Sequence, residues 1–312
     1  MKDKLVTLFG GGGFLGRYVA RALLQAGARV RIAQRAPRQA YFVKPQGGLG
    51  QTQFVAADVT RADSVARAVA GADAVVNLVG ILRGDFDAVH RAGAANVARA
   101  AADAGVGALV HLSAIGADPR SASAYGRSKA AGEKAVREAF AGATILRPSV
   151  VFGREDRFVN RFAGLIQLAP VVPVVRGKTR FQPVFVGDVA QAVATALADP
   201  GRFAGRDFDL GGPEVVDMAS LNARIAEWTG RERGFAQVPD GVAAAMAKAL
   251  GWLPGAPMTW DQWLMLGADN VVAAGADGLD AFGIVPTPIA AVAPGWLVQY
   301  RRHGRFGGVK AA

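Results

Sequence analysis

Apolar and polar positions follow two alternating patterns through the first half of the chain. Short continuous apolar runs, typical of strands buried on both faces, are each followed by a segment with apolar residues at helical spacing. The apolar runs predict strands at 4–9, 28–33, 54–56, 74–78, 108–112 and 143–146. The segments between them predict helices at 17–26, 64–70, 86–104 and 124–140. Strands that alternate with helices predict an α/β protein with a Rossmann-type, doubly wound parallel sheet.

The pattern changes after about Val151, where the helical segments become shorter and prolines interrupt them at Pro170, Pro173 and Pro183. We therefore predict three regions. They are a dinucleotide-binding core at 1–150, a mixed segment at 151–300 that returns partly to the core and forms a smaller substrate or docking lobe, and a basic tail at 301–312. In the lobe, the apolar stretch 238–253 either packs in a core or presents an apolar face to a partner or a membrane surface.

Composition narrows the class of protein. The chain of 312 residues is 51% hydrophobic and 20% charged, which fits an ordered globular protein. Cysteine is absent, and three scattered histidines without a carboxylate cluster argue against a metal site. The net charge of +11 fits a generally basic composition, or attraction to an anionic cofactor, a membrane surface or an acidic partner. Nucleic acid is not expected as a partner, because the arginines are dispersed and no nucleic-acid-binding module is recognisable.

The sequence predicts neither a secretory signal nor a membrane span. The amino end leads directly into the first predicted strand, and the longest apolar candidate, 165–175, is interrupted by Gln167, Pro170 and Pro173. We therefore expect a cytoplasmic protein.

A glycine-rich turn joins the first predicted strand to the first predicted helix. Its spacing is G-x-x-G-x-x-G over residues 10–16. Glycines permit a tight turn and let a pyrophosphate approach the main chain, while the following helix directs its free N–H groups and positive dipole end at the anion. Because a strand precedes this turn and a helix follows it, we predict a dinucleotide site here. Its predicted ligands are Gly10, Gly13, Phe14, Leu15 and Gly16.

The end of the second predicted strand indicates which dinucleotide is bound. NAD-selective folds usually carry Asp or Glu at this point, but here Gln34 and Arg35 follow the strand. The Arg35 guanidinium can form a bidentate charged hydrogen bond with a 2′-phosphate, although an ordinary surface arginine is the alternative. We predict NADP(H), with NAD(H) as the alternative cofactor.

Residues after the later strands complete the predicted cofactor site. Asp58, beside Val59, either accepts a hydrogen bond from the adenine amino group or caps the next helix. Leu78, Val79 and Gly80 end the fourth strand, where a small residue lets the cofactor ribose pass. After the sixth strand, Pro148 is included as a further cofactor contact.

A Tyr-x-x-x-Lys motif, Tyr125 to Lys129, begins the last predicted helix of the core. Residues four apart share one face of a helix, so Lys129 can reach the nicotinamide ribose beside the tyrosine. We expect the lysine charge to lower the pKa of Tyr125, so that the phenol can exchange a proton with a carbonyl or an alcohol.

The glycine turn and the Tyr-x-x-x-Lys motif together resemble the extended or atypical short-chain dehydrogenase/reductases. The stretches 130–140, 145–158 and 182–190 are similar to the nucleotide-binding accessory subunit of respiratory complex I and its bacterial relatives, and 152–158 is the most specific part. The resemblance covers 4–215 well and continues more weakly to about Leu297. It implies a structurally held NADPH and a place beside complex I at the inner face of the membrane, although membership of the complex is implied less strongly for bacterial relatives.

The proton relay of that family is incomplete in this chain. Active members carry Ser or Thr after the fifth strand; Ser113 is present, but the usual position lies about two residues later, at Ala114 and Ile115. Extended relatives also tend to carry Asn in the preceding helix, where this chain has Val89-His90-Arg91. We expect His90 on a helix surface and His111 in a strand with its imidazole hydrogen-bonded.

Three functions fit these observations. The first is an NADP(H)-binding protein whose cofactor is structural and which serves the assembly or stability of complex I, with complex I subunits or the membrane surface as partners. The second is an active NADPH-dependent reductase or sugar-nucleotide epimerase, with Tyr125, Lys129 and Ser113 as catalytic residues. The third is a redox-sensing regulatory protein that binds the same cofactor.

Overall fold

The computed structural model of the protein describes residues 1–253, 255–302 and 304. Chain contacts divide it into two compact units. Unit 1 contains 1–148, 186–210 and 273–285, and unit 2 contains 149–185, 211–272 and the residues from 286 onward. Most of the predicted basic tail, His303 and 305–312, lies outside the described residues. Among the described helices, none is both long and apolar enough to cross a bilayer.

Unit 1 is built on a seven-stranded sheet with the order β11-β6-β5-β4-β1-β2-β3, in which every pair of neighbours is parallel. The strands are β1 (Leu5–Phe9), β2 (Arg29–Gln34), β3 (Thr52–Ala56), β4 (Ala74–Asn77), β5 (Ala108–Leu112), β6 (Thr144–Pro148) and β11 (Asp207–Leu210). From β3 to β6 this is the strand order of a Rossmann fold, with the direction of winding reversed between β1 and β4. The predicted fold class is confirmed.

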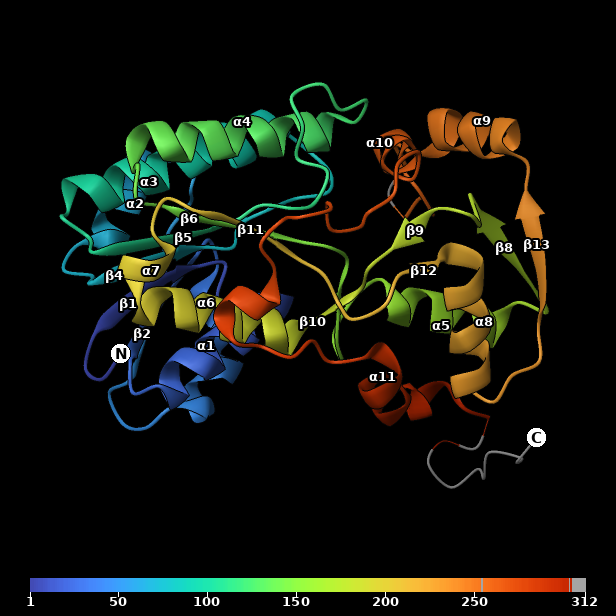
Figure 1. Ribbon diagram of the computed structural model, residues 1–312, viewed down its shortest axis with the longest axis horizontal. Helices are drawn as coiled ribbons and strands as arrows, with labels where there is room; N and C mark the ends of the chain where they lie inside the picture. The colour runs from blue at the N-terminus through green and yellow to red at the C-terminus, as the bar shows by residue number, and fades with distance from the viewer. Residues whose placement is uncertain (254, 303, 305–312) are drawn as a thin grey trace. The chain divides into compact units, whose positions relative to one another are not determined.

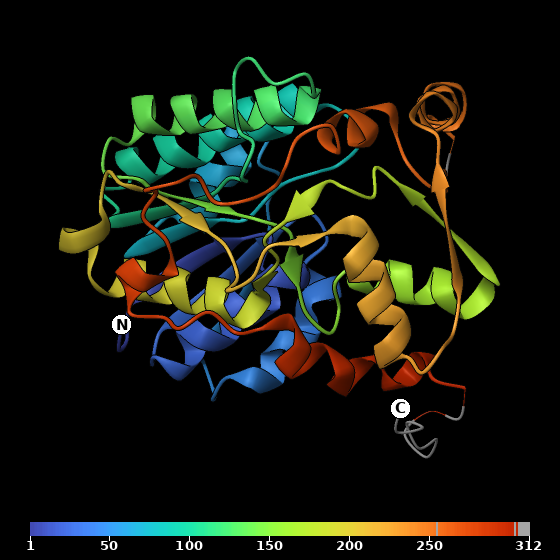
Figure 2. The same ribbon diagram turned by 45° about the vertical axis from the view of Figure 1, so that its right-hand side comes forward.

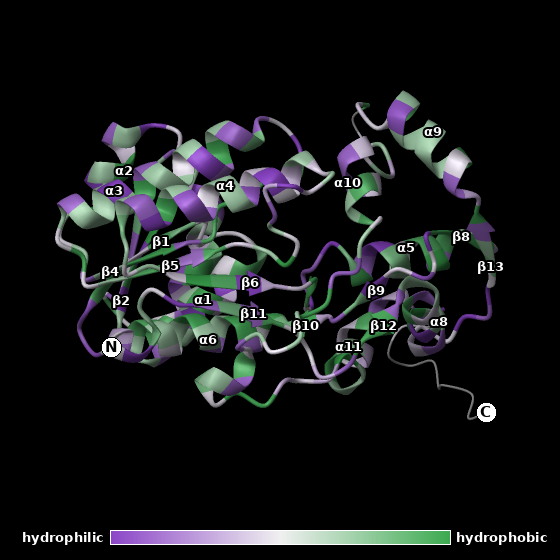
Figure 3. Ribbon diagram, turned by 45° about the horizontal axis from the view of Figure 1, so that its top comes forward, coloured by the Kyte–Doolittle hydropathy of each residue, from purple (hydrophilic) through white to green (hydrophobic). Residues whose placement is uncertain are grey.

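Helices cover both faces of this sheet. The helix α1 (Phe14–Gln25) packs on α6 (Val186–Ala198) on one face, and α3 (Ala94–Asp103) packs between α2 (Ala62–Val69) and α4 (Ala124–Ala139) on the other (Figures 1 and 2). Apolar residues of the strands and of the helices form a buried cluster between the layers. The strands of the sheet are mostly hydrophobic, whereas the helices carry both hydrophobic and hydrophilic residues (Figure 3). The sheet is therefore buried on both faces, as its continuous apolar runs predict.

Two segments of unit 1 differ from the sequence prediction. The stretch after β2, predicted as a loop, contains the 3₁₀-helix η1 (Pro37–Gln46). The long helix predicted at 86–104 begins with a π-helical segment, η2 (Asp87–Gly93), and becomes an α-helix only from Ala94. Such π-helical turns are rare and frequently occur at functional sites.

Unit 1 also contains short helices after α6, namely α7 (Pro200–Phe203) and the 3₁₀-helix η3 (Leu279–Phe282). Phe203, Phe208 and Phe282 form an aromatic cluster here, with ring centroids of Phe203 and Phe282 stacked 4.6 Å apart. This cluster joins the later chain segments to the edge strand β11.

The described part of unit 2 consists of three two-stranded sheets and several helices. The strand pairs are β7 (Val151–Phe152) with β10 (Val184–Phe185), β9 (Arg180–Phe181) with β12 (Val216–Asp217), and β8 (Val171–Val175) with β13 (Gly234–Val238). The helices are α5 (Val159–Leu168), α8 (Met218–Trp228), α9 (Asp240–Leu250), α10 (Trp260–Met265), α11 (Ile289–Leu297) and the 3₁₀-helix η4 (Val298–Tyr300). A buried apolar cluster joins α5, α8 and α11.

The apolar stretch 238–253 forms α9 and the turn after it. Only Ala243 and Ala247 of this helix are buried, whereas Met246, Leu250 and Trp252 are 47%, 46% and 76% exposed. Packing of these three larger side chains in a core, one of the two interpretations of the sequence, is therefore wrong.

Candidate functional site

Apart from Tyr125 and Lys129 of α4, the predicted cofactor residues of unit 1 lie at or just after the carboxyl ends of parallel strands. The glycine turn follows β1, Arg35 follows β2, Asp58 follows β3 and Leu78 to Gly80 follow β4. Ser113 follows β5, and Pro148 is the last residue of β6. Because parallel strands end at one edge of the sheet, the fold brings these residues to the same edge, at the reversal between β1 and β4 where open α/β sheets bind ligands.

The glycine turn is shaped by two positions that require glycine. Gly10 has φ of 80°, in the left-handed region, and its carbonyl oxygen accepts a hydrogen bond from Gly13 N–H at 2.9 Å. At Gly16, a Cβ atom would clash with that carbonyl and lie 2.7 Å from the Gly11 Cα. The first turn of α1 therefore lies directly against the main chain that leaves β1.

The start of α1 leaves three N–H groups available. The first helical hydrogen bond runs from Arg17 N–H to the Gly13 carbonyl at 3.2 Å. Within the described residues, Phe14, Leu15 and Gly16 therefore have no helical acceptor for their N–H groups, as expected for the first turn of a helix. Three N–H groups at the positive end of a helix dipole fit the diphosphate of a dinucleotide.

The carboxyl end of β2 has one hydrogen-bonded side chain, that of Gln34, followed by one exposed charge, that of Arg35. Gln34 accepts a hydrogen bond from Gly12 N–H at 2.9 Å and donates one to the Ala36 carbonyl at 2.7 Å, so it joins the glycine turn to the end of β2. Arg35, the next residue, is exposed. Its guanidinium makes no hydrogen bond or ion pair with any described residue, which leaves it available to an anionic ligand.

Asp58 is held by a local turn. Its Oδ1 accepts hydrogen bonds from Thr60 N–H at 3.0 Å and from Thr60 Oγ1 at 2.8 Å, and these bonds, with the charges of Arg35 and Arg61, lower the pKa of Asp58. The N-cap of α2 is Arg61, so the interpretation of Asp58 as the helix cap is wrong. Contact with adenine stays a prediction.

The end of β4 lies against the glycine turn. A Cβ atom at Gly10 would lie 3.5 Å from the Leu78 carbonyl carbon and from Val79 Cγ2. Asn77, the last residue of β4, accepts a hydrogen bond from Val79 N–H at 3.1 Å. Its amide nitrogen lies 3.2 Å from His111 Nδ1 on β5.

The Tyr-x-x-x-Lys motif begins α4. Ser123 caps this helix by accepting a hydrogen bond from Gly126 N–H at 2.9 Å, which places Tyr125 in its first turn. Lys129 is 4% exposed, and its Nζ donates to the Leu112 carbonyl at the end of β5 at 2.7 Å. Burial lowers the pKa of Lys129 to about 8, an effect that the charge of Glu133 partly opposes.

The expectation that Lys129 lowers the pKa of Tyr125 is wrong for this structure. Burial raises the pKa of Tyr125 to about 12, because removal from water disfavours the phenolate. At neutral pH the phenol is therefore protonated, so it can donate a proton to a carbonyl but is a poor base.

His111 lies in β5, and Ser113 is the first residue after this strand. The Ser113 Oγ is buried and has no hydrogen-bond partner among the described residues, so it fits a polar group of a ligand. His111 Nε2 is likewise buried and unpartnered within the described part of the chain, so the expectation of a fully hydrogen-bonded imidazole is wrong. Burial lowers the pKa of His111 well below its usual value.

His90 belongs to this group although sequence reasoning placed it on a helix surface. It is 2% exposed, and its ring contacts both the segment after β4 and the first turn of α4. The surface assignment is wrong because it assumed an α-helix throughout 86–104. The π-helical segment η2 has more residues per turn, which changes the side of the helix on which His90 lies.

An ion-pair network holds α4 against the sheet. Arg147 of β6 donates to both carboxylate oxygens of Glu133, at 2.8 and 2.6 Å, and to Asp207 of β11 at 2.9 Å. Glu133 is 4% exposed. A bidentate, largely buried pair fixes the position of one side chain relative to another, so it fixes the turn of α4 that follows Lys129.

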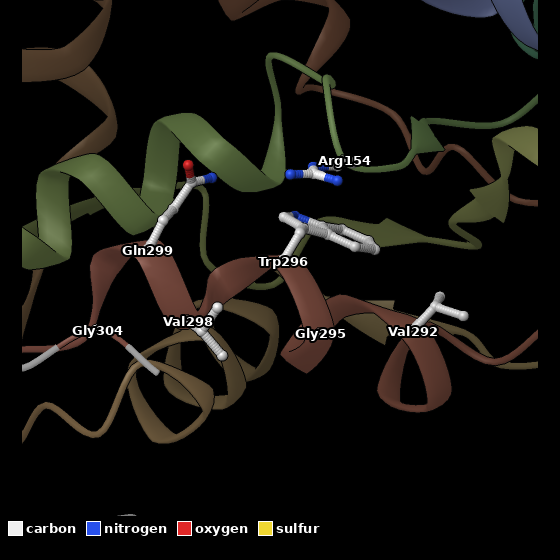
Figure 4. A pocket seen from close by; sticks show the side chains of 7 residues that line it. All are labelled: Arg154, Val292, Gly295, Trp296, Val298, Gln299 and Gly304. Atoms are coloured by element: carbon white, nitrogen blue, oxygen red, sulfur yellow. The ribbon is translucent and has the colours of Figure 1, made fainter. Parts of the chain in front are cut away.

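Unit 2 contains a cavity of about 480 Å³ between α11 and the segment before α5. Arg154, Trp296 and Gln299 line it, with Val292, Gly295, Val298 and Gly304 (Figure 4). It shares no residue with the predicted cofactor site.

Comparison with known proteins identifies the class. A model of the NAD dependent epimerase/dehydratase family matches residues 6–211. The chain belongs to this family, whose cofactor is a nicotinamide dinucleotide.

Particular relatives narrow the comparison. The chain is 36% identical over 292 residues to mitochondrial NADH dehydrogenase (ubiquinone) 1 alpha subcomplex subunit 9 of Mus musculus, covering 91% of this chain and 77% of that protein. It is 31% identical over 241 residues to a ceramide reductase of Caulobacter vibrioides, covering 75% and 70%. In fold it resembles the NADPH-dependent quinone oxidoreductase QOR2 of Escherichia coli, with a TM-score of 0.76 and 20% identity over 94% and 99% of the two chains. The resemblance to the complex I subunit found in the sequence is confirmed.

Proposed function

We propose that this protein binds NADP(H) at the carboxyl edge of the seven-stranded sheet, holds it as a structural cofactor with little turnover, and serves the assembly or stability of a respiratory complex I. The observation that carries the proposal is the state of the Tyr-x-x-x-Lys pair. The pKa of Tyr125 is raised to about 12, and the Lys129 amine is hydrogen-bonded to the Leu112 carbonyl.

The adenine half of the cofactor site supports the choice of NADP(H). The N–H groups at the start of α1 fit the diphosphate, and the exposed Arg35 guanidinium after β2 fits a 2′-phosphate. No acidic residue stands at the end of β2, where NAD-selective folds bind the ribose hydroxyls. The quinone oxidoreductase of similar fold was crystallised with NADPH.

The nicotinamide half supports binding more than proton transfer. A general acid–base works best when its pKa lies near the operating pH, and the pKa of Tyr125 lies far above it. The position that carries Ser or Thr in active members is occupied here by Ala114 and Ile115. Tyr125, Lys129 and the unpartnered Ser113 hydroxyl are then ligands of the nicotinamide ribose and carboxamide.

Similarity to the mouse subunit over most of both chains supports complex I subunits as partners. We accordingly place the protein in the cytoplasm, at the inner face of the membrane that holds the complex. The net charge of +11 favours such a peripheral position.

The proposal is tested on protein purified under mild conditions. We expect NADPH to copurify, to resist dialysis, and to remain reduced when aldehydes, ketones, quinones and nucleotide sugars are added. Tyr125→Phe removes one hydrogen bond to the ribose and should weaken cofactor binding by no more than about tenfold. Rapid oxidation of NADPH that disappears in Tyr125→Phe would contradict a structural cofactor.

An active NADPH-dependent reductase is the second candidate, and the similarity to a ceramide reductase over 75% of the chain favours it. Its substrate would then be a ceramide or a similar lipid with a reducible carbonyl group. Turnover of NADPH with a ceramide-like carbonyl compound, lost in Tyr125→Phe and in Lys129→Met, would establish this function in place of the first.

A further inference from the structure

The side chain of His90 connects two segments of the candidate cofactor site. His90 lies in η2, and its main chain presses against α4: a Cβ atom at Gly132 would clash with the His90 carbonyl oxygen. The imidazole is 2% exposed and is therefore held almost entirely by protein contacts.

The hydrogen bonds of the ring define its protonation. Ile81 N–H donates to His90 Nε2 at 2.9 Å, and a main-chain N–H can only donate, so Nε2 carries no proton. In the neutral ring the proton is therefore on Nδ1, which lies 2.8 Å from Ser128 Oγ. The Ser128 hydroxyl in turn donates to the Tyr125 carbonyl at 2.8 Å. One continuous set of hydrogen bonds thus runs from the segment after β4 to the first turn of α4.

Aromatic contacts hold the ring in this orientation. Phe86 stacks on His90 with centroids 5.5 Å apart, and the Tyr125 ring meets His90 edge-on at 5.4 Å. Burial and the charge of Lys129 lower the pKa of His90 to about 4. The other ionisable groups around it are the neutral His111 of β5 and, on η2 itself, the exposed Asp87–Arg91 pair. At neutral pH the ring is uncharged and both of its nitrogens are engaged.

We infer that His90 is a positioning residue for the nicotinamide half of the cofactor site. As the Nδ1–H tautomer, His90 holds the Ile81 N–H through Nε2 and the start of α4, through Ser128, by Nδ1. These two contacts set the distance between the segment after β4 and Tyr125, so that the nicotinamide ribose fits between them. This inference rests on the proposed function, which places that ribose against Tyr125 and Lys129. His90 contacts no cofactor atom in this account and acts only through its neighbours.

Three substitutions separate the two hydrogen bonds of the ring. His90→Gln keeps an acceptor at the position of Nε2, His90→Asn keeps a donor at the position of Nδ1, and His90→Phe keeps only the ring. The ligands are NADPH and adenosine 2′,5′-diphosphate, which contains only the adenine half. Arg91→Ala is the matched control, because Arg91 is the next residue and its side chain is exposed.

We expect His90→Phe to weaken NADPH binding about tenfold, which corresponds to the loss of one hydrogen bond. The other two variants should weaken NADPH binding less. Affinity for adenosine 2′,5′-diphosphate should stay within about twofold in all variants, since the adenine half does not contact His90. Equal weakening of both ligands would show a general structural defect and overturn the inference. Unchanged NADPH affinity in His90→Phe would also overturn it.

The tautomer provides a readout that needs no cofactor. Long-range ¹H–¹⁵N spectra distinguish the two ring nitrogens, and the chain contains only three histidines, so His90→Gln and His111→Gln suffice for assignment. We expect the proton of His90 on Nδ1 at pH 7. A proton on Nε2, or a charged ring, would overturn the inference even if NADPH binds. If the unchanged protein binds no NADPH but shows the Nδ1–H tautomer, the proposed function fails and the hydrogen-bond geometry stands.

Discussion

The two halves of the candidate cofactor site are built differently. The adenine half, after β1 and β2, consists of main-chain N–H groups at the start of α1 and the exposed charge of Arg35. The nicotinamide half, after β4 and β5, consists of buried polar side chains, among them Lys129 and Ser113. The first half can bind an anion without any neighbouring side chain being correctly placed, whereas the second depends on tertiary packing. The two halves should therefore respond differently to substitution.

The largest expected effect is at Gly16 in the adenine half. Gly16→Ala places a Cβ atom against the main chain of Gly10 and Gly11, so we expect NADPH affinity to fall more than 100-fold and stability to fall by about 3 kcal/mol. Titration calorimetry and urea unfolding measure the two effects. Gly164→Ala is the control, because its Cβ would meet nothing within 4 Å. Normal NADPH binding by Gly16→Ala would show that the helix does not need this close approach.

The next effect concerns the support of the nicotinamide half. Glu133→Gln leaves Arg147 without its buried bidentate partner, and we expect a loss of about 3 kcal/mol in the free energy of unfolding. Glu138→Gln, on the exposed side of the same helix, should change it by less than about 1 kcal/mol. Equal effects of the two variants in urea unfolding would mean that the ion-pair network does not hold α4.

Arg35 tests the adenine half without disturbing the core. Arg35→Glu should lower the affinity for NADPH about 30-fold, because a charged hydrogen bond to the 2′-phosphate is replaced by repulsion. It should lower the affinity for NADH less than threefold. Stability should not change, since the side chain is exposed. Arg67→Glu, an exposed arginine of α2, controls for the change in net charge. The assignment of Arg35 to the 2′-phosphate is refuted if NADPH and NADH weaken equally.

The nicotinamide half should also respond to pH. The pKa of His90 is about 4 in the folded protein against 6.5 for an ordinary histidine, so the folded state binds fewer protons between these values. The free energy of unfolding should therefore fall as the pH drops below about 6.5, and His111 acts in the same direction. Between pH 7 and pH 5, the decrease in the free energy of unfolding should be about 1–2 kcal/mol smaller in His90→Gln than in the unchanged protein. An identical pH dependence of both proteins in urea unfolding would contradict the buried neutral ring.

The same contrast explains what could be predicted from the sequence. The positions of the glycine turn after β1 and of Arg35 after β2 could be predicted from the order of strands and helices, and their contacts with a cofactor stay predictions. Continuous apolar runs likewise identified six of the seven strands of the sheet. The edge strand β11 was missed, because apolar and acidic residues alternate in it. The role of His90 could not be found, because the π-helical segment breaks the helical period by which residues are assigned to faces. The raised pKa of Tyr125 and the lysine's bond to Leu112 depend on burial, which spacing alone does not report.

The most direct test of the central claim follows backbone amides during an NADPH titration of ¹⁵N-labelled protein. The N–H groups of Phe14, Leu15 and Gly16 should show the largest shifts and slowed hydrogen exchange, saturating together as the diphosphate binds. Unmoved signals from these three residues at saturating NADPH would contradict the account, whether the cofactor binds elsewhere or not at all.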